Sequence, residues 1–172
     1  HDAYWSYRDA FFDLLPAPPA RALEVGCGEG RVCRDLAARG YETVGLDAAV
    51  TLVAAAASAD PVGVYVTGLA EALPFAAESF YLVVSYNSLM DVVDMPCTLA
   101  EIGRVLRSGG RFCACVLHPL MDAGRFAGDS DAAPFVVEGS YFEEREYEVL
   151  SERDGISFLF RSRRYTLASY WA

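Results

Sequence analysis

Residues 21–47 read RALEVGCGEGRVCRDLAARGYETVGLD, and this stretch decides the fold. A short apolar run over residues 21–25 leads into glycines at alternate positions, which is typical of a buried strand that ends in a tight turn. Residues 31–39 have helical apolar spacing and are followed by a glycine, a common helix end. A second apolar run, residues 42–46, ends at Asp47. The stretch therefore predicts a strand, a glycine loop, a helix and a second strand.

The same alternation continues after residue 47. Helical spacing at residues 48–59 and 98–106 alternates with apolar runs at 62–66, 80–85 and 111–117, and an aromatic helix over 4–15 precedes them all. Strands that alternate with helices indicate a parallel sheet covered on both faces. The expected fold class is α/β, a Rossmann-like three-layer sandwich with a mostly parallel sheet.

The sequence changes character after residue 117. Residues 124–134 are small, acidic and loop-like, and residues 166–171 resemble the start of a helix. Residues 146–151 and 156–163 alternate apolar and polar side chains across Asp154-Gly155, which predicts a β-hairpin. We therefore expect one domain over residues 1–172, with a core at about 20–117 and a β-hairpin insertion after strand five that caps a substrate.

Composition argues against several classes of function. The 172 residues carry a net charge of −10, which disfavours nonspecific binding to nucleic acid. No apolar run approaches the roughly 20 residues that a membrane-spanning helix needs. The five cysteines form no C-x-x-C pair, which argues against a disulfide framework or a zinc site and for a reducing compartment. We expect a cytoplasmic protein that needs no metal and acts on neither nucleic acid nor membrane.

The glycine loop predicts a nucleotide-like ligand without a phosphate. Ligands of open α/β sheets bind at the carboxyl ends of the strands, where the Asp47 carboxylate could accept hydrogen bonds from a ribose. A dinucleotide loop, G-x-G-x-x-G, would place its third glycine at position 31, which is Arg31. Glu24, two positions before Gly26, would repel a pyrophosphate and favours a cationic ligand. Each residue also has a purely structural alternative. The glycines could serve only to make the turn, Asp47 could cap a helix, and Glu24 could be a carboxylate paired within the strand.

Four segments carry a resemblance to a known family. Residues 22–47 contain its glycine motif and acidic loop, and residues 68–75, GLAEALPF, are similar to its adenine-binding segment. Residues 80–84 resemble its fourth strand, and residues 101–111, EIGRVLRSGGR, its helix-to-strand junction. In this order and spacing they resemble class I S-adenosylmethionine (SAM)-dependent methyltransferases, of the type 11 branch that includes ubiquinone and menaquinone biosynthesis enzymes. The resemblance implies a methyltransferase that converts SAM to S-adenosylhomocysteine.

The resemblance also implies a set of cofactor-binding residues. Glu24 and the glycine loop would face the methionine part of SAM. Asp47 would hold the ribose, and Ala48 would pack on the adenine. Leu69 and Ala70, after the third strand, would lie along the edge of the adenine. Two residues at the end of the fourth strand, Ser85 and Tyr86, would lie near the amino group and the sulfonium. The set is Glu24, Gly26, Cys27, Gly28, Gly30, Asp47, Ala48, Leu69, Ala70, Ser85 and Tyr86.

Two positions depart from the family pattern, which usually has aspartate at both. Leu69 cannot accept a hydrogen bond from the adenine amino group, which would cost about 0.5–1.5 kcal/mol of binding. Tyr81 lies early in the fourth strand, where we expect a packing change.

The sequence shows no strong catalytic constellation. Methyl transfer is a direct displacement that depends on in-line proximity, and it needs a base only if the acceptor loses a proton. His118 follows the fifth strand and is the candidate base; a loop histidine beside Pro119 is the equal alternative. Further candidates for lining the cleft, or for packing on the sheet, are Tyr4, Tyr7, Tyr86, Asn87 and Asp91.

Two other functions stay open, a noncatalytic SAM-binding module and a nicotinamide-dependent oxidoreductase. Sheets of the resembled family finish with a helix and two further strands, which these 172 residues do not contain. We therefore expect a fragment, or a shortened sheet with an exposed edge that a homodimer or a partner would cover. The acceptor is expected to be a small molecule.

Overall fold

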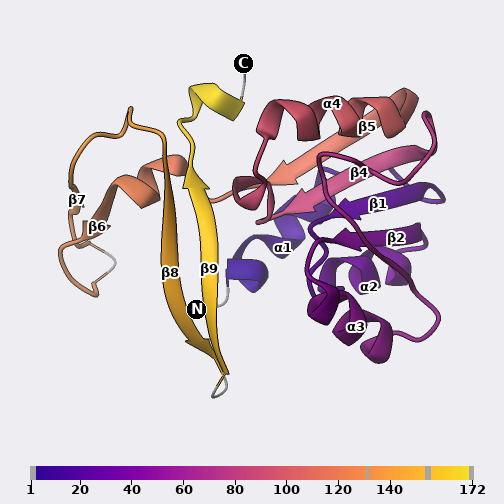
Figure 1. The fold of residues 1–172 in the computed structure, drawn as a ribbon, viewed down its shortest axis with the longest axis horizontal. Helices are drawn as coiled ribbons and strands as arrows, with labels where there is room; N and C mark the ends of the chain where they lie inside the picture. Colours follow the sequence, from indigo (N-terminus) through magenta and orange to yellow (C-terminus); the bar gives the residue numbers. More distant parts are fainter. Residues whose placement is uncertain (1–2, 131, 154–155, 171–172) are drawn as a thin grey trace. The chain divides into compact units, whose positions relative to one another are not determined.

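The computed structural model describes residues 3–130, 132–153 and 156–170, which fall into two compact units, His1–Cys115 and Val116–Ala172. The first unit holds a five-stranded sheet in the order β3-β2-β1-β4-β5, with every neighbouring pair parallel (Figure 1). Its strands are β1 (Arg21–Val25), β2 (Glu42–Asp47), β3 (Val64–Thr67), β4 (Phe80–Tyr86) and β5 (Leu106–Cys115). The predicted Rossmann-like α/β fold is confirmed.

Helices cover both faces of this sheet. They are α1 (Ala3–Asp13), α2 (Arg31–Ala38), α3 (Val50–Ala59) and α4 (Met95–Val105), with a short 3-10 turn, η1 (Leu89–Asp91). Ala22 of β1 packs in one buried cluster with α1 and α2, whereas its neighbour Leu23 packs in a second cluster with α4. Successive strand side chains point to opposite faces, so an apolar strand such as β1 is buried on both. No helix in the described ranges is long and apolar enough to cross a membrane.

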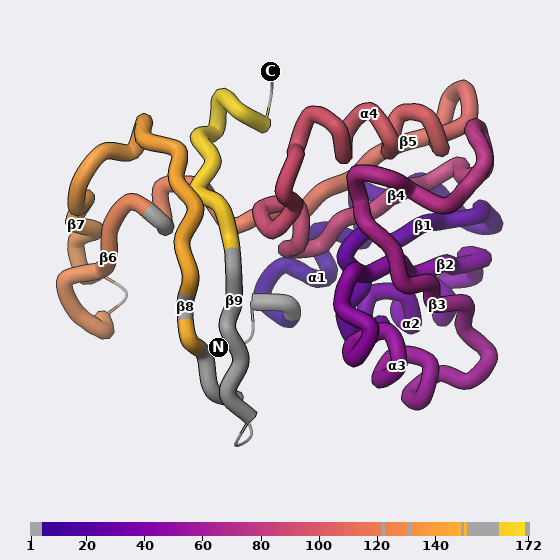
Figure 2. The backbone as a smooth tube through the Cα atoms, viewed as in Figure 1, coloured from indigo at the N-terminus to yellow at the C-terminus, as the bar shows by residue number. Residues whose placement is uncertain are grey.

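The strand order reverses at β1. Figure 2 shows the backbone of β1 running between those of β2 and β4. The chain moves outward from β1 to β2 and β3, then returns to β4 and β5 on the other side. Such a reversal opens a crevice at the carboxyl ends of the strands. The glycine loop after β1 and the segment after β4 meet at this point.

The junction of α4 and β5 differs from the prediction. The helix begins at Met95 rather than residue 98, because the Asp94 side chain accepts a hydrogen bond from the Cys97 amide at 2.9 Å and caps it. Strand β5 begins at Leu106 rather than residue 111. Gly109 and Gly110, a pair that in sequence is typical of a helix end, lie inside β5, where the pairing with β4 shifts register.

The second unit contains two hairpins. Strands β8 (Arg145–Arg153) and β9 (Ile156–Arg164) pair antiparallel, which confirms the predicted hairpin; Asp154 and Gly155 lie outside the described residues. Strands β6 (Gly124–Phe126) and β7 (Phe135–Val137) also pair, so the loop prediction was wrong at 124–126, where three residues are too few to show a period. The unit also holds two 3-10 turns, η2 (Pro119–Ala123) and η3 (Ala168–Tyr170), the latter where a helix start was expected. That residues 1–172 form one domain with a substrate cap stays a prediction.

Candidate functional site

The glycine loop after β1 is tied to the end of β2 by backbone hydrogen bonds. The amides of Gly26 and Cys27 both donate to the Leu46 carbonyl, at 2.8 and 2.9 Å. The Gly28 amide donates to Oδ2 of Asp47 at 2.8 Å. The loop is therefore held in a fixed conformation at the point where the strand order reverses.

The glycines of this loop differ in how much space surrounds them. A Cβ on Gly26 would lie 2.3 Å from the Cβ of Ser88, so that position is closed by the protein itself. A Cβ on Gly28 would meet nothing within 4 Å, although its φ of 53° still favours glycine. Gly30 is the N-cap residue of α2, against the Tyr65 ring. Only Gly28 leaves open space, as expected of a backbone that a ligand approaches closely.

We expect Gly26→Ala to lower the free energy of unfolding by about 1–3 kcal/mol more than Gly28→Ala does, because overpacking against Ser88 adds to the backbone strain that both variants share. Gly28→Ala should instead lose about fivefold in SAM affinity, since its methyl group enters the open space. Chemical denaturation and calorimetric titration measure the two effects. Equal destabilisation of both variants, with unchanged SAM binding by Gly28→Ala, would contradict this division of roles.

Asp47 connects three loops. Its Oδ2 accepts from the Gly28 amide and its Oδ1 from the Ala49 amide, both at 2.8 Å, and its carbonyl accepts from the Gly68 amide at 3.0 Å. Ala49, not Asp47, is the N-cap residue of α3. Each carboxylate oxygen has a second lone pair, so the group can still accept hydrogen bonds from a ribose.

Glu24 is a buried acid with an unused acceptor. Its side chain lies in β1 and is 2% exposed. The pKa of Glu24 is raised to about 8, chiefly by burial; hydrogen bonds from Cys33 oppose this rise, and the nearby Asp47 and Glu29 carboxylates add to it. Its Oε2 atom has no hydrogen-bond partner within the described part of the chain. A carboxyl group of this kind gains from a cationic donor, so it fits the positively charged methionine end of SAM.

The charge of Glu29 is already balanced. Its carboxylate pairs with Arg34 at 2.6 Å and with Arg31 at 3.1 Å. Arg31 stands where a dinucleotide-binding loop would have its third glycine. Here its side chain forms a salt bridge with Glu29 of the same loop. Glu24 and Asp47 are the loop acids left to meet a ligand.

The remaining predicted cofactor residues divide into exposed and buried ones. After β2 and β3, Ala48 is exposed, Ala70 is half-buried, and the Leu69 side chain is 58% exposed. Cys27, by contrast, is buried, so the loop offers its backbone there. Much of the Leu69 side chain is therefore available for contact with a ligand's aromatic ring.

Ser85 and Tyr86 are placed in the core rather than at an open surface. Ser85 is fully buried, and its hydroxyl lies 2.8 Å from that of Ser88, which donates to the Val25 carbonyl at 2.7 Å. The Tyr86 ring packs edge-on against Phe11 with centroids 4.9 Å apart. Their side chains thus support the loop after β1 and the α1 face, and their contact with the cofactor stays a prediction.

Sequence reasoning missed Ser88 and gave Asn87 only as one of several cleft candidates. Asn87 has a φ of 53°, a conformation that non-glycine residues adopt mainly where the surrounding structure demands it. Its amide donates to the Cys115 carbonyl at 2.7 Å, which ties the end of β4 to β5. The available signal was the polar run Ser-Tyr-Asn-Ser that ends an otherwise apolar strand.

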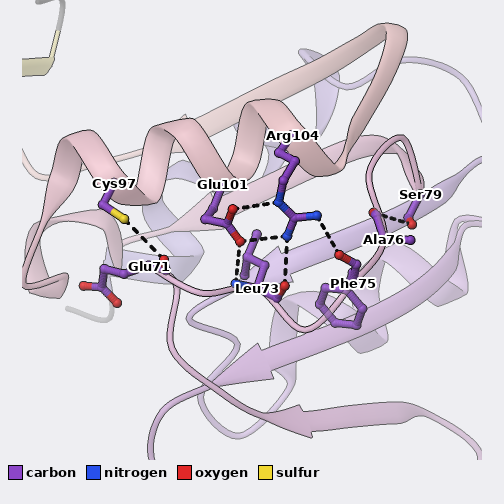
Figure 3. A network of polar contacts seen from close by, with 8 residues as sticks. All are labelled: Glu71, Leu73, Phe75, Ala76, Ser79, Cys97, Glu101 and Arg104. Atoms are coloured by element: carbon purple, nitrogen blue, oxygen red, sulfur yellow. Dashed lines mark hydrogen bonds and ion pairs between the residues drawn. The ribbon is translucent and has the colours of Figure 1, made fainter.

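A network from α4 holds the segment after Ala70. Figure 3 shows Glu101 and Arg104 reaching from the helix to that segment. Glu101 accepts from the Leu73 amide at 2.8 Å, and Arg104 donates to the carbonyls of Leu73 at 2.9 Å and Phe75 at 2.8 Å. The two side chains also pair at 2.7 Å, and the hydrogen bonds from the Arg104 guanidinium are the main reason that the pKa of Glu101 is lowered. The helix thus sets the path of the backbone that follows Leu69.

Arg104→Met should weaken SAM binding about three- to fivefold, because two carbonyls and the Glu101 carboxylate lose a charged donor and the segment is no longer held. Arg111→Met, a substitution at an exposed arginine of β5, is the matched control. Calorimetric titration gives the affinities, and amide NMR shifts of Leu69 and Ala70 report the displacement. An Arg104→Met chain that binds SAM as well as the control does would refute the positioning role.

His118 lies in the second unit, where it caps η2. Its Nδ1 accepts from the Leu120 amide at 3.2 Å, and the side chain is exposed. A neutral imidazole whose Nδ1 is an acceptor carries its proton on Nε2, which makes Nε2 a donor rather than a base. The loop-histidine interpretation describes this arrangement, and a role as base stays a prediction.

Known proteins share this fold and loop arrangement. Residues 23–114 match the family described as methyltransferase domain. The chain is 35% identical over 108 residues to an uncharacterised methyltransferase of Synechocystis sp., covering 62% of this chain and 51% of that protein. It is 36% identical over 114 residues to a demethylmenaquinone methyltransferase of Mycobacterium sp., covering 66% and 48%. The chain thus spans about half the length of these curated relatives.

A solved structure extends the likeness to both units. A SAM-dependent methyltransferase from Mesorhizobium loti superposes with a TM-score of 0.80 at 22% identity, covering 96% of this chain and 77% of that one. At this identity the likeness concerns the fold. The family match over residues 23–114 includes Glu24, the glycine loop and Asp47. The chain belongs to the methyltransferase domain family, the class I SAM-dependent methyltransferases, whose cofactor is SAM.

Proposed function

We propose that the protein containing this chain transfers the methyl group of SAM to a small-molecule acceptor by direct displacement. The observation that carries the proposal is the pair of acids at the glycine loop. Glu24 has an unpartnered buried oxygen, and Asp47 is held by two amides with lone pairs to spare. This arrangement suits a cationic nucleoside and disfavours a pyrophosphate.

Each part of the cofactor has a proposed partner. Glu24 and the backbone at Gly28 would bind the methionine part, and Asp47 the ribose hydroxyls. Ala48, Leu69 and Ala70 would contact the adenine, consistent with the exposed Leu69 side chain. When bound, SAM supplies an electrophilic methyl group on its sulfonium. The chain's own contribution is then to hold that group in line with an acceptor, which proximity alone makes effective.

Composition supports a small-molecule acceptor and a cytoplasmic location. A net charge of −10 disfavours a nucleic acid acceptor, and a relative named demethylmenaquinone methyltransferase is consistent with a small organic acceptor. The five cysteines are free thiols, which fits a cytoplasmic location. His118 enters the proposal as a base only for an acceptor that must lose a proton.

Calorimetric titration of the chain with SAM, and with NAD as the competing hypothesis, tests the cofactor assignment. We expect saturable binding of SAM only. Incubating the full-length protein with SAM and a panel of phenols, amines and thiols should then yield S-adenosylhomocysteine with at least one acceptor class. Binding without turnover would favour the noncatalytic module, and binding of NAD alone would overturn the proposal. If His118 is the base, His118→Ala should lower the rate for a phenol but not for an amine that is already deprotonated.

A further inference from the structure

A cavity lies at the end of the sheet where the parallel strands begin, opposite to the glycine loop. It has a volume of about 560 Å³ and is lined mainly by residues that begin strands, among them Arg21, Glu42, Ser79, Tyr81 and Arg107. The glycine loop, Asp47 and Asn87 lie at the other ends of these strands. The volume is in the range of small-molecule sites, and nothing in the proposed methyl transfer uses this cavity.

The charges of this cavity are predominantly positive. Two guanidinium groups face a single carboxylate, Glu42, which accepts from Nε of Arg21 at 3.3 Å. Arg107 forms no ion pair with any residue in the described ranges. The lining of this cavity thus carries one surplus positive charge, although the chain as a whole has a net charge of −10. An anion entering it would gain charge-assisted hydrogen bonds.

Both arginines lie within cation–π distance of an aromatic ring. The guanidinium carbon of Arg21 lies 5.0 Å from the centroid of the Phe80 ring, and that of Arg107 lies 5.9 Å from the centroid of the Tyr81 ring. A guanidinium group near an aromatic ring is attracted to the ring electrostatically and can still donate hydrogen bonds through its N–H groups. Phe80 is fully buried, but Tyr81 lines the cavity and adds both a hydroxyl group and apolar ring surface beside the charges.

An irregularity of the sheet places two of these residues. Phe80 pairs with Leu106 and Leu82 with Arg111, so residues 107–110 of β5 lie opposite Tyr81 alone. A Cβ on Gly110 would lie 2.8 Å from the Arg107 carbonyl oxygen and 3.0 Å from that of Tyr81, so this tight bulge requires glycine. Bulges re-aim side chains and are common next to binding sites.

We propose that this cavity binds a small organic anion, a carboxylate or phosphate attached to an apolar group. Arg107 and the remaining donors of Arg21 would hold the anion, and the Tyr81 ring would contact the apolar part. The site is separate from the cofactor crevice and does not depend on the proposed function.

The test is an NMR titration of the isotopically labelled chain with phenyl phosphate, with inorganic phosphate and benzoate as companions at matched ionic strength. We expect saturable shifts at the amides of Arg21, Tyr81 and Arg107, with phenyl phosphate or benzoate binding more tightly than inorganic phosphate. Arg107→Gln should weaken the tighter probe about fivefold, as loss of a charged donor predicts. Arg125→Gln, at an arginine paired with Glu138 in the second unit, removes the same charge elsewhere and should leave binding unchanged.

The outcomes separate the sources of binding. Tighter benzoate would assign a carboxylate ligand, and tighter phenyl phosphate a phosphate ester; both support the site. Equal weak shifts with all probes, an adventitious ion only, would overturn the proposal. So would equal losses in Arg107→Gln and Arg125→Gln, which would indicate bulk charge. Repeating the titration with saturating S-adenosylhomocysteine should leave the shifts intact, and competition would instead assign the probe to the cofactor crevice.

Discussion

Glu24→Gln is expected to bind SAM at least tenfold more weakly at pH 7.5 than the unmodified chain, and yet to be the more stable of the two at pH 9 without cofactor. Both effects have one cause. The buried Glu24 carboxyl has an unpartnered oxygen and a pKa raised to about 8, chiefly by burial. Ionising it inside the protein is costly unless a cation arrives, and glutamine neither ionises nor attracts the cation.

The sign of the pH dependence follows from proton binding. The unfolded chain releases the Glu24 proton near the ordinary value of 4.5, whereas the folded chain keeps it until about pH 8. The folded state therefore binds more protons between these values, and its stability falls as pH rises through the window, by up to about 1.4 kcal/mol per pH unit. Below pH 8, SAM must displace this proton to pair with the carboxylate, so its affinity should rise with pH between 6 and 7.5.

Thermal denaturation from pH 5 to 9 and calorimetry at pH 6 and 7.5 measure both effects. In Glu24→Gln, the stability slope above pH 5 should flatten and the affinity should lose its pH dependence. Glu138→Gln is the control, because that carboxylate lies in the second unit and is paired with Arg125. If both variants keep the slope of the unmodified chain, Glu24 is not the titrating group.

Asp47→Ala is expected to weaken SAM binding at least tenfold, since a hydrogen bond to a charged group contributes about 1.5–3 kcal/mol. The change removes a ribose acceptor, and it also leaves the amides of Gly28 and Ala49 without their partner. We therefore expect a loss of about 1–3 kcal/mol in unfolding free energy as well.

Asp47→Asn separates these two effects. Its amide keeps one acceptor oxygen, so it can bind one of the two backbone amides and should recover part of the stability, but it lacks the charge that favours ribose hydroxyls. Calorimetry and chemical denaturation of both variants give the comparison. Unchanged SAM affinity in Asp47→Ala would remove this carboxylate from the cofactor site.

The sequence predicted most of the sheet because its strands are buried on both faces. An apolar run such as 21–25, between a proline-rich segment and a glycine loop, is best accommodated as a buried strand. The start of β5 was harder to predict, since Gly109 and Gly110 mark a turn in isolation. Only the pairing with β4 shows that the strand continues through them as a bulge.

The site was predictable where backbone position decides it and less so where side-chain direction does. Gly28 and Asp47 follow strands whose ends must meet, so their proximity follows from the fold. Ser85 lies at the same edge, but its hydroxyl turns into the core toward Ser88, which no local pattern reveals. The support from Glu101 and Arg104 joins residues about 30 positions apart and depends on the packing of α4.

The bonds made by Asp47 bear on the thermodynamics of cofactor capture. One side chain and its carbonyl join the turns that follow β1, β2 and β3. These turns consequently share a single geometry before any nucleoside arrives, and little conformational entropy is lost when it docks. Such preorganisation lets enthalpic contacts count almost fully toward affinity. The product keeps the nucleoside part of the cofactor, so it should benefit from the same preorganised turns and lose only the attraction of its former positive sulfur.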